Sequence, residues 1–224
     1  MAAALAVLLA AAIGTTAASA QSTRRPRRET TANRKARIAK TIQQTYGHPW
    51  EAAGGGGYMR YRSGQYQQQD NQVSFWVDTR YSLNSLSPKL GILGTVQGSY
   101  GKAKIGNVQG IDIPNPQISE YAFMAGPSYR FLGREKYAVS GFAQAGLDLG
   151  KFAGGSKGFT AADIGVWQGD FAPVFSVGAS LDYNIDTSFA LRVSPSYIGT
   201  TFGSTMQNSK ALNVGIVYRF GKAK

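Results

Sequence analysis

Between about residue 55 and residue 220, apolar and polar side chains alternate along the chain with a period of two. In the segment 73–81, Val73, Phe75 and Val77 share one face, whereas Asp78 and Arg80 share the other. This period is that of a β-strand with one apolar face, and no part of the region keeps the 3.6-residue stripe of an amphipathic helix. The alternation predicts eight strands, at 55–62, 72–82, 89–100, 117–131, 136–149, 171–184, 188–199 and 209–220.

The connections between these strands alternate between long and short. The longer ones are 63–71, 101–116, 150–170 and 200–208, and the shorter ones are 83–88, 132–135 and 185–187. A meander that enters a bilayer from one side has short turns at one end and longer loops at the other. The sequence therefore predicts an all-β fold, an eight-stranded antiparallel up-and-down transmembrane β-barrel over residues 55–220.

Alternation alone does not distinguish a soluble barrel with an apolar interior from a membrane barrel with an apolar exterior. The polar face here consists mainly of Gly, Ser, Gln, Asp and Arg, with almost no Lys. That composition fits a narrow, packed lumen better than a water-exposed surface. Trp76, Leu93 and Phe142 also fall on this face, and we interpret them as lumen filling. Pro127 and Pro195 interrupt two strands, so we expect bulges or distorted pairing there.

The polar face carries ten charged side chains, which an eight-stranded lumen is too narrow to keep hydrated. We expect them to pair across the interior, since a buried unpaired charge is strongly destabilising. The predicted lumen ion-pair network comprises Arg60, Arg62, Asp78, Arg80, Glu120, Arg130, Asp148, Asp182, Arg192 and Arg219. A lumen filled in this way is a plugged polar core rather than an open channel.

Aromatic residues stand at the strand ends on the apolar face, as in the interfacial girdle of membrane barrels. The predicted girdle comprises Tyr81, Tyr100, Tyr129, Phe131, Tyr137, Tyr183, Phe189, Tyr218 and Phe220. The last strand alternates Leu212, Val214, Ile216, Tyr218 and Phe220 with polar or small residues.

With this terminal strand, residues 51–224 resemble the small outer-membrane β-barrel proteins, the superfamily of the transmembrane domain of outer membrane protein A. Stretches such as 115–119, 154–158 and 202–205 are similar to those of its single-domain members. The resemblance implies an outer-membrane location and a monomer surrounded by outer-membrane lipids. Family barrels usually end on the terminal aromatic residue, whereas a tail of residues 221–224 follows Phe220 in this chain.

The N-terminal region predicts export. Residues 1–20 contain a short apolar stretch that ends in Ala18-Ser19-Ala20, the pattern of a cleaved signal peptide. Residues 21–54 then form a basic periplasmic segment and linker, in which 24–40 hold eight Lys or Arg against the single acid Glu29. We expect this segment to meet anionic periplasmic surfaces, and not nucleic acid. A short helix is predicted at 33–45.

The residues present argue against several classes of chemistry. The chain has no Cys and one His, His48, which excludes thiol nucleophiles and sites built on two histidines. His48 precedes the first predicted strand and fits a solvated linker position. Carboxylate-only acid–base chemistry by Asp78, Glu120, Asp148 or Asp182 is less plausible than structural ion pairing. We therefore predict no enzyme, no catalytic site, no metal site and no cofactor.

Three functions remain open at this level. The first is a structural or surface-interaction barrel that presents 101–116 and 150–170 outside the cell. The second is a small passive pore, and the third is a soluble periplasmic ligand-binding barrel.

Overall fold

The computed structural model describes residues 30–62, 64, 69–103, 116–154, 158, 160–202 and 206–222. The predicted signal peptide and the first part of the basic segment lie outside the described residues, as do most of the predicted loop 101–116 and the last two residues. The chain divides into two units, residues 1–34 and residues 35–224.

Helix α1 spans Thr31–Tyr46, so the predicted short helix is present and slightly longer than expected. Thr30 precedes it in an N-cap position, where its hydroxyl accepts a hydrogen bond from the Asn33 amide at 3.4 Å. Ala, Arg, Lys and Gln, which are strong helix formers, make up much of its sequence. Within the described part of the chain, no helix has the length and hydropathy needed to cross a membrane.

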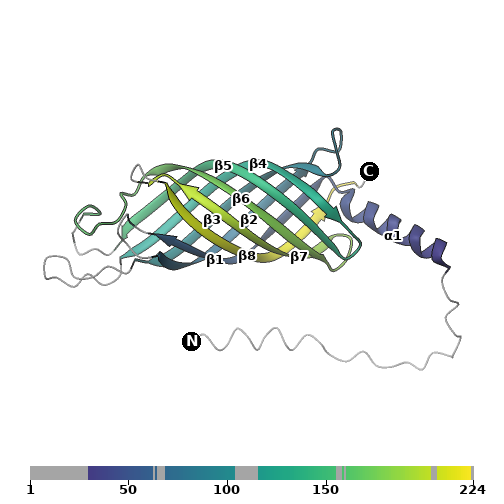
Figure 1. Cartoon of the computed structure of the whole chain (residues 1–224), viewed down its shortest axis with the longest axis horizontal. Helices are drawn as coiled ribbons and strands as arrows, with labels where there is room; N and C mark the ends of the chain where they lie inside the picture. Colours follow the sequence, from purple (N-terminus) through teal and green to yellow (C-terminus); the bar gives the residue numbers. More distant parts are fainter. Residues whose placement is uncertain are drawn as a thin grey trace, which may run out of the picture. The chain divides into compact units, whose positions relative to one another are not determined.

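Eight antiparallel strands form a closed barrel in which each strand pairs with its sequence neighbours and β1 also pairs with β8 (Figure 1). The strands are β1 (Trp50–Arg62), β2 (Gln69–Ser82), β3 (Leu90–Lys102), β4 (Gln117–Gly133), β5 (Tyr137–Gly154), β6 (Phe171–Asn184), β7 (Phe189–Thr200) and β8 (Gln207–Phe220). The predicted fold is confirmed.

The two ends of the barrel are distinguished by their connections. We call the end with connections 83–89, 134–136 and 185–188 the turn end, and both Trp50 and Phe220 lie there as a cross-strand pair. The loop end carries the other connections, 63–68, 103–116, 155–170 and 201–206. The predicted length alternation is clear for the later connections, whereas 63–68 and 83–89 are nearly equal because β2 extends further toward the loop end than expected.

The first strand begins at Trp50, earlier than the predicted start at residue 55, so the end of the predicted linker, residues 50–54, belongs to the barrel. Gly55 and Gly215 are opposite each other where β1 meets β8. A Cβ atom on Gly55 would lie 2.1 Å from the Val214 carbonyl oxygen, and one on Gly215 would lie 2.2 Å from the Gly54 carbonyl oxygen. The indole of Trp76 fills the lumen beside this glycine-lined seam. The glycines are therefore required for close backbone approach at the closure of the barrel.

Pro127 and Pro195 both point to the outer surface, as does Pro173 in β6, and no register shift lies at Pro127 or Pro195. Near these two prolines, pairs are missing from the ladder between Ala125 and Ser128 on the β5 side, and opposite Ser194 and Pro195 on the β6 side. The shifts in the β4–β5 register lie elsewhere, at 117/119 and 130/132. The expected distortion is present, but as local loss of pairing without a bulge.

Candidate functional site

The half of the lumen nearest the turn end contains a connected group of ion pairs centred on Glu51. Its carboxylate lies 3.6 Å from Arg80 Nη1 and 3.5 Å from Arg219 Nε. It also contacts Arg130 directly, and its second oxygen lies 3.6 Å from Arg192 Nη2. All five side chains are buried. A single carboxylate on β1 therefore connects arginines from β2, β4, β7 and β8.

The second centre of the group is Asp182 on β6. Arg192 donates two parallel hydrogen bonds to it, from Nε to Oδ1 at 2.7 Å and from Nη2 to Oδ2 at 2.8 Å. Arg219 Nη2 approaches the same carboxylate at 3.4 Å, and Asp78 Oδ2 lies 3.7 Å from Arg192 Nη1. The two-point Arg–carboxylate geometry is the strongest form of such a pair. We call Glu51, Asp78, Arg80, Arg130, Asp182, Arg192 and Arg219 the turn-half network.

The strand register explains this convergence. Glu51 is the Cα partner of Arg80 on one side and of Arg219 on the other, and Asp182 is the partner of Arg192. Oppositely charged side chains directly across neighbouring strands stabilise their pairing. Arg80 is held further by hydrogen bonds to Ser128 Oγ, Ser82 Oγ and the Lys89 carbonyl oxygen.

Tyr46, at the C-terminal end of α1, covers the network at the turn end. Arg130 and Arg219 face its ring, with guanidinium carbons 4.5 Å and 5.4 Å from the ring centroid. The Tyr46 hydroxyl donates to the Arg134 carbonyl oxygen at 2.8 Å and accepts from Asn184 Nδ2 at 2.8 Å. Burial raises the pKa of Tyr46 above its usual value, against the lowering effect of Asn184 and the two arginines. The neutral phenol is therefore the form that caps the lumen.

The half of the lumen nearest the loop end is filled mainly by apolar side chains. Phe152 packs edge to face on Phe202, with ring centroids 5.0 Å apart, and stacks on Tyr61 at 6.1 Å. Trp167, from the connection between β5 and β6, donates from Nε1 to the Arg62 carbonyl oxygen at 3.3 Å. Ile164 and Val166 of the same connection join this cluster. The described part of that connection thus closes the barrel mouth.

Glu120 and Asp148 lie in this loop half, where sequence reasoning expected an arginine partner for each. All four buried arginines of the described chain lie in the turn-half network instead. Ser99 Oγ donates to Glu120 Oε2 at 3.4 Å, while Glu120 Oε1 and Asp148 Oδ1 have no hydrogen-bond partner among the described residues. These two carboxylates are therefore separate from the ion-pair group.

Arg60 and Arg62 do not face the lumen, contrary to the prediction. Both are exposed, and the lumen positions of this part of β1 are occupied by Met59 and Tyr61. The reason is that the loop half of the lumen is apolar, so the usual rule of polar side chains inside and apolar side chains outside is reversed at the end of β1. The residue missed by the prediction is Glu51, because the first strand was started too late to include it.

The outer surface is apolar around the whole barrel. Every member of the predicted girdle is exposed on it, with exposures from 37% for Phe220 to 62% for Phe131. Eight of the nine lie toward the turn end, and only Tyr100 lies toward the loop end, where its hydroxyl contacts that of Tyr121. Trp50, which the prediction left out, joins the turn-end group by contacts with Tyr81 and Phe220.

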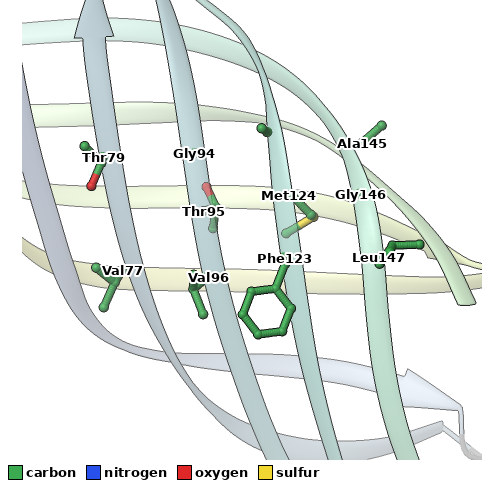
Figure 2. A pocket seen from close by; sticks show the side chains of 11 residues that line it. Val77, Thr79, Gly94, Thr95, Val96, Phe123, Met124, Ala145, Gly146 and Leu147 are labelled. Carbon is green, nitrogen blue, oxygen red and sulfur yellow. The ribbon is translucent and has the colours of Figure 1, made fainter. Parts of the chain in front are cut away.

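A groove of about 590 Å³ runs along this outer surface over β2 to β5 (Figure 2). Figure 2 shows Val77, Val96, Phe123 and Leu147 along one side, and these residues form successive cross-strand pairs. Small residues, among them Gly94, line its floor. The groove therefore belongs to the apolar belt and offers no charged group.

His48 is half-buried and its Nδ1 lies 2.8 Å from the Gly221 carbonyl oxygen, so it connects the segment after α1 to the end of β8. Within the described ranges, no group of three or more His, Cys, Asp or Glu side chains could hold a metal ion.

Comparisons with known proteins give the same fold. No protein-family model and no curated protein sequence matches the chain. Among solved structures, the neisserial surface protein NspA is similar at 14% identity with a TM-score of 0.56, covering 77% of this chain and 97% of NspA. Ail, the attachment invasion locus protein of Yersinia pestis, in complex with the heparin analogue sucrose octasulfate, has 20% identity and a TM-score of 0.49, covering 76% and 97%. OprG of Pseudomonas aeruginosa has 9% identity and a TM-score of 0.48, covering 78% and 98%.

The fold is thus that of the small eight-stranded outer-membrane β-barrels. Its closed ladder leaves no free strand edge, and its exterior presents apolar side chains with aromatic residues near the strand ends. Lipid is the surrounding that matches such an exterior. The protein is an outer-membrane β-barrel.

Proposed function

We propose that this outer-membrane barrel has a structural or surface-interaction role, with a lumen that does not conduct ions and with long loops that meet partners outside the cell. The observation that carries the proposal is the Glu51 centre, where one buried carboxylate engages arginines from four strands. Ion pairs of this kind fill the cross-section of the turn half. The apolar cluster of Phe152, Phe202 and Trp167 fills the loop half.

The alternative of a passive pore has less support. A conducting barrel needs a continuous water-filled path, and barrels that provide one have about twice as many strands. In this protein such a path would have to displace the paired side chains of the turn half and the packed aromatic rings of the loop half. The alternative of a soluble periplasmic barrel is opposed by the exposed apolar exterior, for which a soluble protein has no use.

Conductance in planar bilayers tests the proposal. The purified full-length barrel should produce no regular single-channel steps, whereas a porin with a water-filled channel, measured in the same bilayers, should produce them. Regular steps that the folded wild type produces and the unfolded protein does not would favour the passive pore over the plugged barrel. Folding is followed by heat-modifiability, the difference in gel migration of a folded barrel before and after boiling.

The loops support the surface role by their position. Standard insertion puts the short turns and both chain ends in the periplasm and the longer loops outside. The connections 103–116 and 155–170 would then be the parts that reach a partner. Replacement of 104–115 by a short Gly-Ser turn, or of 155–159 with the packed residues Ile164, Val166 and Trp167 kept, should leave the barrel folded and abolish binding to the surface that wild-type cells bind. Unchanged binding would remove these loops from the role.

The basic residues of 24–40 would then face the periplasm, where we propose that they attach to anionic surfaces. In the described part of this segment, Arg37 forms an exposed ion pair with Glu135 at 3.4 Å, and pairs of this kind contribute little to stability. Deletion of 24–40 should leave heat-modifiability intact and reduce salt-sensitive binding to anionic vesicles. A barrel that no longer folds after this deletion would assign the segment to the fold instead.

A further inference from the structure

Five unpartnered polar atoms line one small cavity in the loop half of the lumen. They are Tyr61 Oη, Gln97 Nε2, Glu120 Oε1, Asp148 Oδ1 and Thr200 Oγ1, and none has a hydrogen-bond partner among the described residues. All five side chains are more than nine-tenths buried and come from different strands, β1, β3, β4, β5 and β7. Buried polar groups in proteins are nearly always satisfied, so this convergence indicates a missing partner.

The cavity itself has room for one small occupant. Its volume is about 10 Å³, roughly that needed to hold a single water molecule. The hydroxyls of Ser99 and Ser209 complete the polar part of its wall, and Met59, Ala122 and Ile198 form the apolar part. The cluster around Phe152 and Trp167 lies between this level of the lumen and the loop end.

The charges around the cavity indicate that its occupant must neutralise two carboxylates. Glu120 and Asp148 are the charged residues of its wall, and no lysine or arginine is among the lining residues. Two carboxylates in a dry interior must be neutralised, either by a proton or by a positive partner. The four arginines that could have provided one are all engaged in the turn half.

We propose that this cavity, which we call the carboxylate cavity, binds one Ca²⁺ ion between Glu120 and Asp148, with Thr200 and Ser99 as neutral oxygen ligands. A divalent ion balances the two carboxylates. Rotation of the Gln97 amide by half a turn would present its carbonyl oxygen in place of Nε2 as a further ligand. Ca²⁺ accepts six to eight oxygens in irregular geometry at about 2.3–2.6 Å, whereas Mg²⁺ retains several waters for which this cavity has no space.

The site is independent of what the external loops bind, since it lies inside the barrel. It is also sealed by the apolar cluster, so the ion is expected to enter while the barrel folds. In this respect ion binding and folding are coupled.

Equilibrium dialysis with radioactive Ca²⁺ tests the proposal. The full-length protein is refolded in detergent with Ca²⁺ up to millimolar concentrations, the range of weak extracellular calcium sites. The wild type should retain one ion per chain, and the double variant E120Q/D148N should retain none. The matched control D163N/D170N removes two exposed carboxylates from the connection between β5 and β6 and should still retain one ion.

Two further measurements test the proposal if the double variant E120Q/D148N does not fold. Thr200→Val keeps both carboxylates and should weaken Ca²⁺ binding by about tenfold or more, as losses around metal sites usually do. The urea midpoint of wild-type unfolding should rise with Ca²⁺ and stay unchanged at equal ionic strength of NaCl, with Mg²⁺ at least about tenfold less effective.

A wild type that retains no Ca²⁺ and whose unfolding is indifferent to it would overturn the proposal, and would leave a proton shared by Glu120 and Asp148 as the neutralising partner. Equal Ca²⁺ retention by the wild type and E120Q/D148N would overturn it as well, because the bound ion would then lie elsewhere.

Discussion

The two halves of the lumen are lined by the same eight strands, yet they keep their interiors dry by different means. The turn half buries three carboxylates with four arginines, whereas the loop half buries Glu120 and Asp148 without any buried arginine in the described chain. There the space is filled by aromatic rings and by Ile118, Met59 and other apolar side chains. The net charge of a lumen therefore does not show whether each buried charge is neutralised, because neutralisation depends on groups a few ångströms apart.

The two halves of the lumen should also lose stability for different reasons when a side chain is removed. In the turn half, removal of one charged group leaves its partners buried and uncompensated. In the loop half, the main loss on truncation is packing of rings and the cavity that follows. The predictions below use this contrast, from the largest expected effect to the smallest.

Replacement of Glu51 by Leu should have the largest effect, because it leaves Arg80, Arg130 and Arg219 with less compensation at the centre of the network. Breaking a buried ion pair costs about 3–5 kcal/mol, enough to reduce the folded fraction severely. The measurement is heat-modifiability together with the free energy of urea unfolding in lipid vesicles.

The matched substitution in the other half is Glu120→Leu, measured without Ca²⁺. It removes a carboxylate that has no arginine partner, so we expect a loss below about 1 kcal/mol or a gain. Equal losses for Glu51→Leu and Glu120→Leu would show that the two halves do not differ in the way described. The sequence pattern assigns Glu120 and Asp182 to one ion-pair network, and on that pattern alone replacement of either would be expected to impair folding.

Phe152→Ala tests the packing of the loop half. The side chain is almost fully buried between Tyr61 and Phe202, and truncation of such a ring costs about 3 kcal/mol. The loss should be nearly independent of salt, unlike that of the charge variants. Phe131→Ala, on the outer surface, is the control and should cost less, since the position is exposed; a similar cost for both would remove the apolar cluster from the stability of the barrel.

Tyr46→Phe should cost about 1 kcal/mol at neutral pH, the usual contribution of a hydrogen bond, because it removes the hydroxyl contacts to Arg134 and Asn184. The pKa of Tyr46 is raised in the folded state, so its stabilising effect is complete below the unfolded pKa near 10 and is lost as the pH rises through the folded pKa. Urea titrations from pH 8 to 11 should show a smaller alkaline loss in the variant. The same alkaline loss in both proteins would mean that Tyr46 stays neutral throughout.

Asp186→Ala should have the smallest effect, at the surface of the turn end. The amides of Ser188 and Phe189 donate to Asp186 Oδ1 at 2.6 Å and 2.9 Å, which lowers the pKa of this carboxyl. Its contribution is therefore present above the unfolded pKa near 4 and is lost as the pH falls through the lowered value. The urea midpoints of wild type and variant should differ slightly at pH 6 and converge below pH 3; a constant difference would attribute the effect to the turn backbone rather than to the charge.

The sequence predicted the barrel, the strand order and the apolar exterior because these depend on a period of two that persists over many residues. Six members of the predicted ion-pair group are buried in the turn-half network: Asp78, Arg80, Arg130, Asp182, Arg192 and Arg219. Strand register places Asp182 opposite Arg192, and Arg80 and Arg219 on either side of Glu51. Whether they stabilise the protein as proposed is what the Glu51 and Glu120 variants measure.

The sequence did not show where along the barrel the lumen lining changes from charged to apolar side chains. Arg60 and Arg62 follow the alternation of a polar interior, but the rings of Tyr61 and Phe152 occupy the lumen at that level. The rings meet only in the folded barrel, because they come from strands far apart in the chain. Glu51 could have been found from Trp50, an aromatic residue like those at the first positions of β5, β6 and β7, if the first strand had been extended back through Gly54.

The glycine seam between β1 and β8 has a consequence for the rate at which the protein folds. It joins the strands that are farthest apart in the chain, with Trp50 opposite Phe220, so its formation carries the largest loop-closure entropy of the eight pairings. The glycines add to that barrier, since glycine loses more backbone freedom on ordering than any other residue. Along Gly54 to Gly57 the β1 edge has no side chains to hold an incomplete encounter together, and the Trp76 ring can settle beside Gly215 only once the strands meet. We therefore expect closure of the seam to be the slow step of folding, during which the two edge strands expose unpaired backbone to lipid.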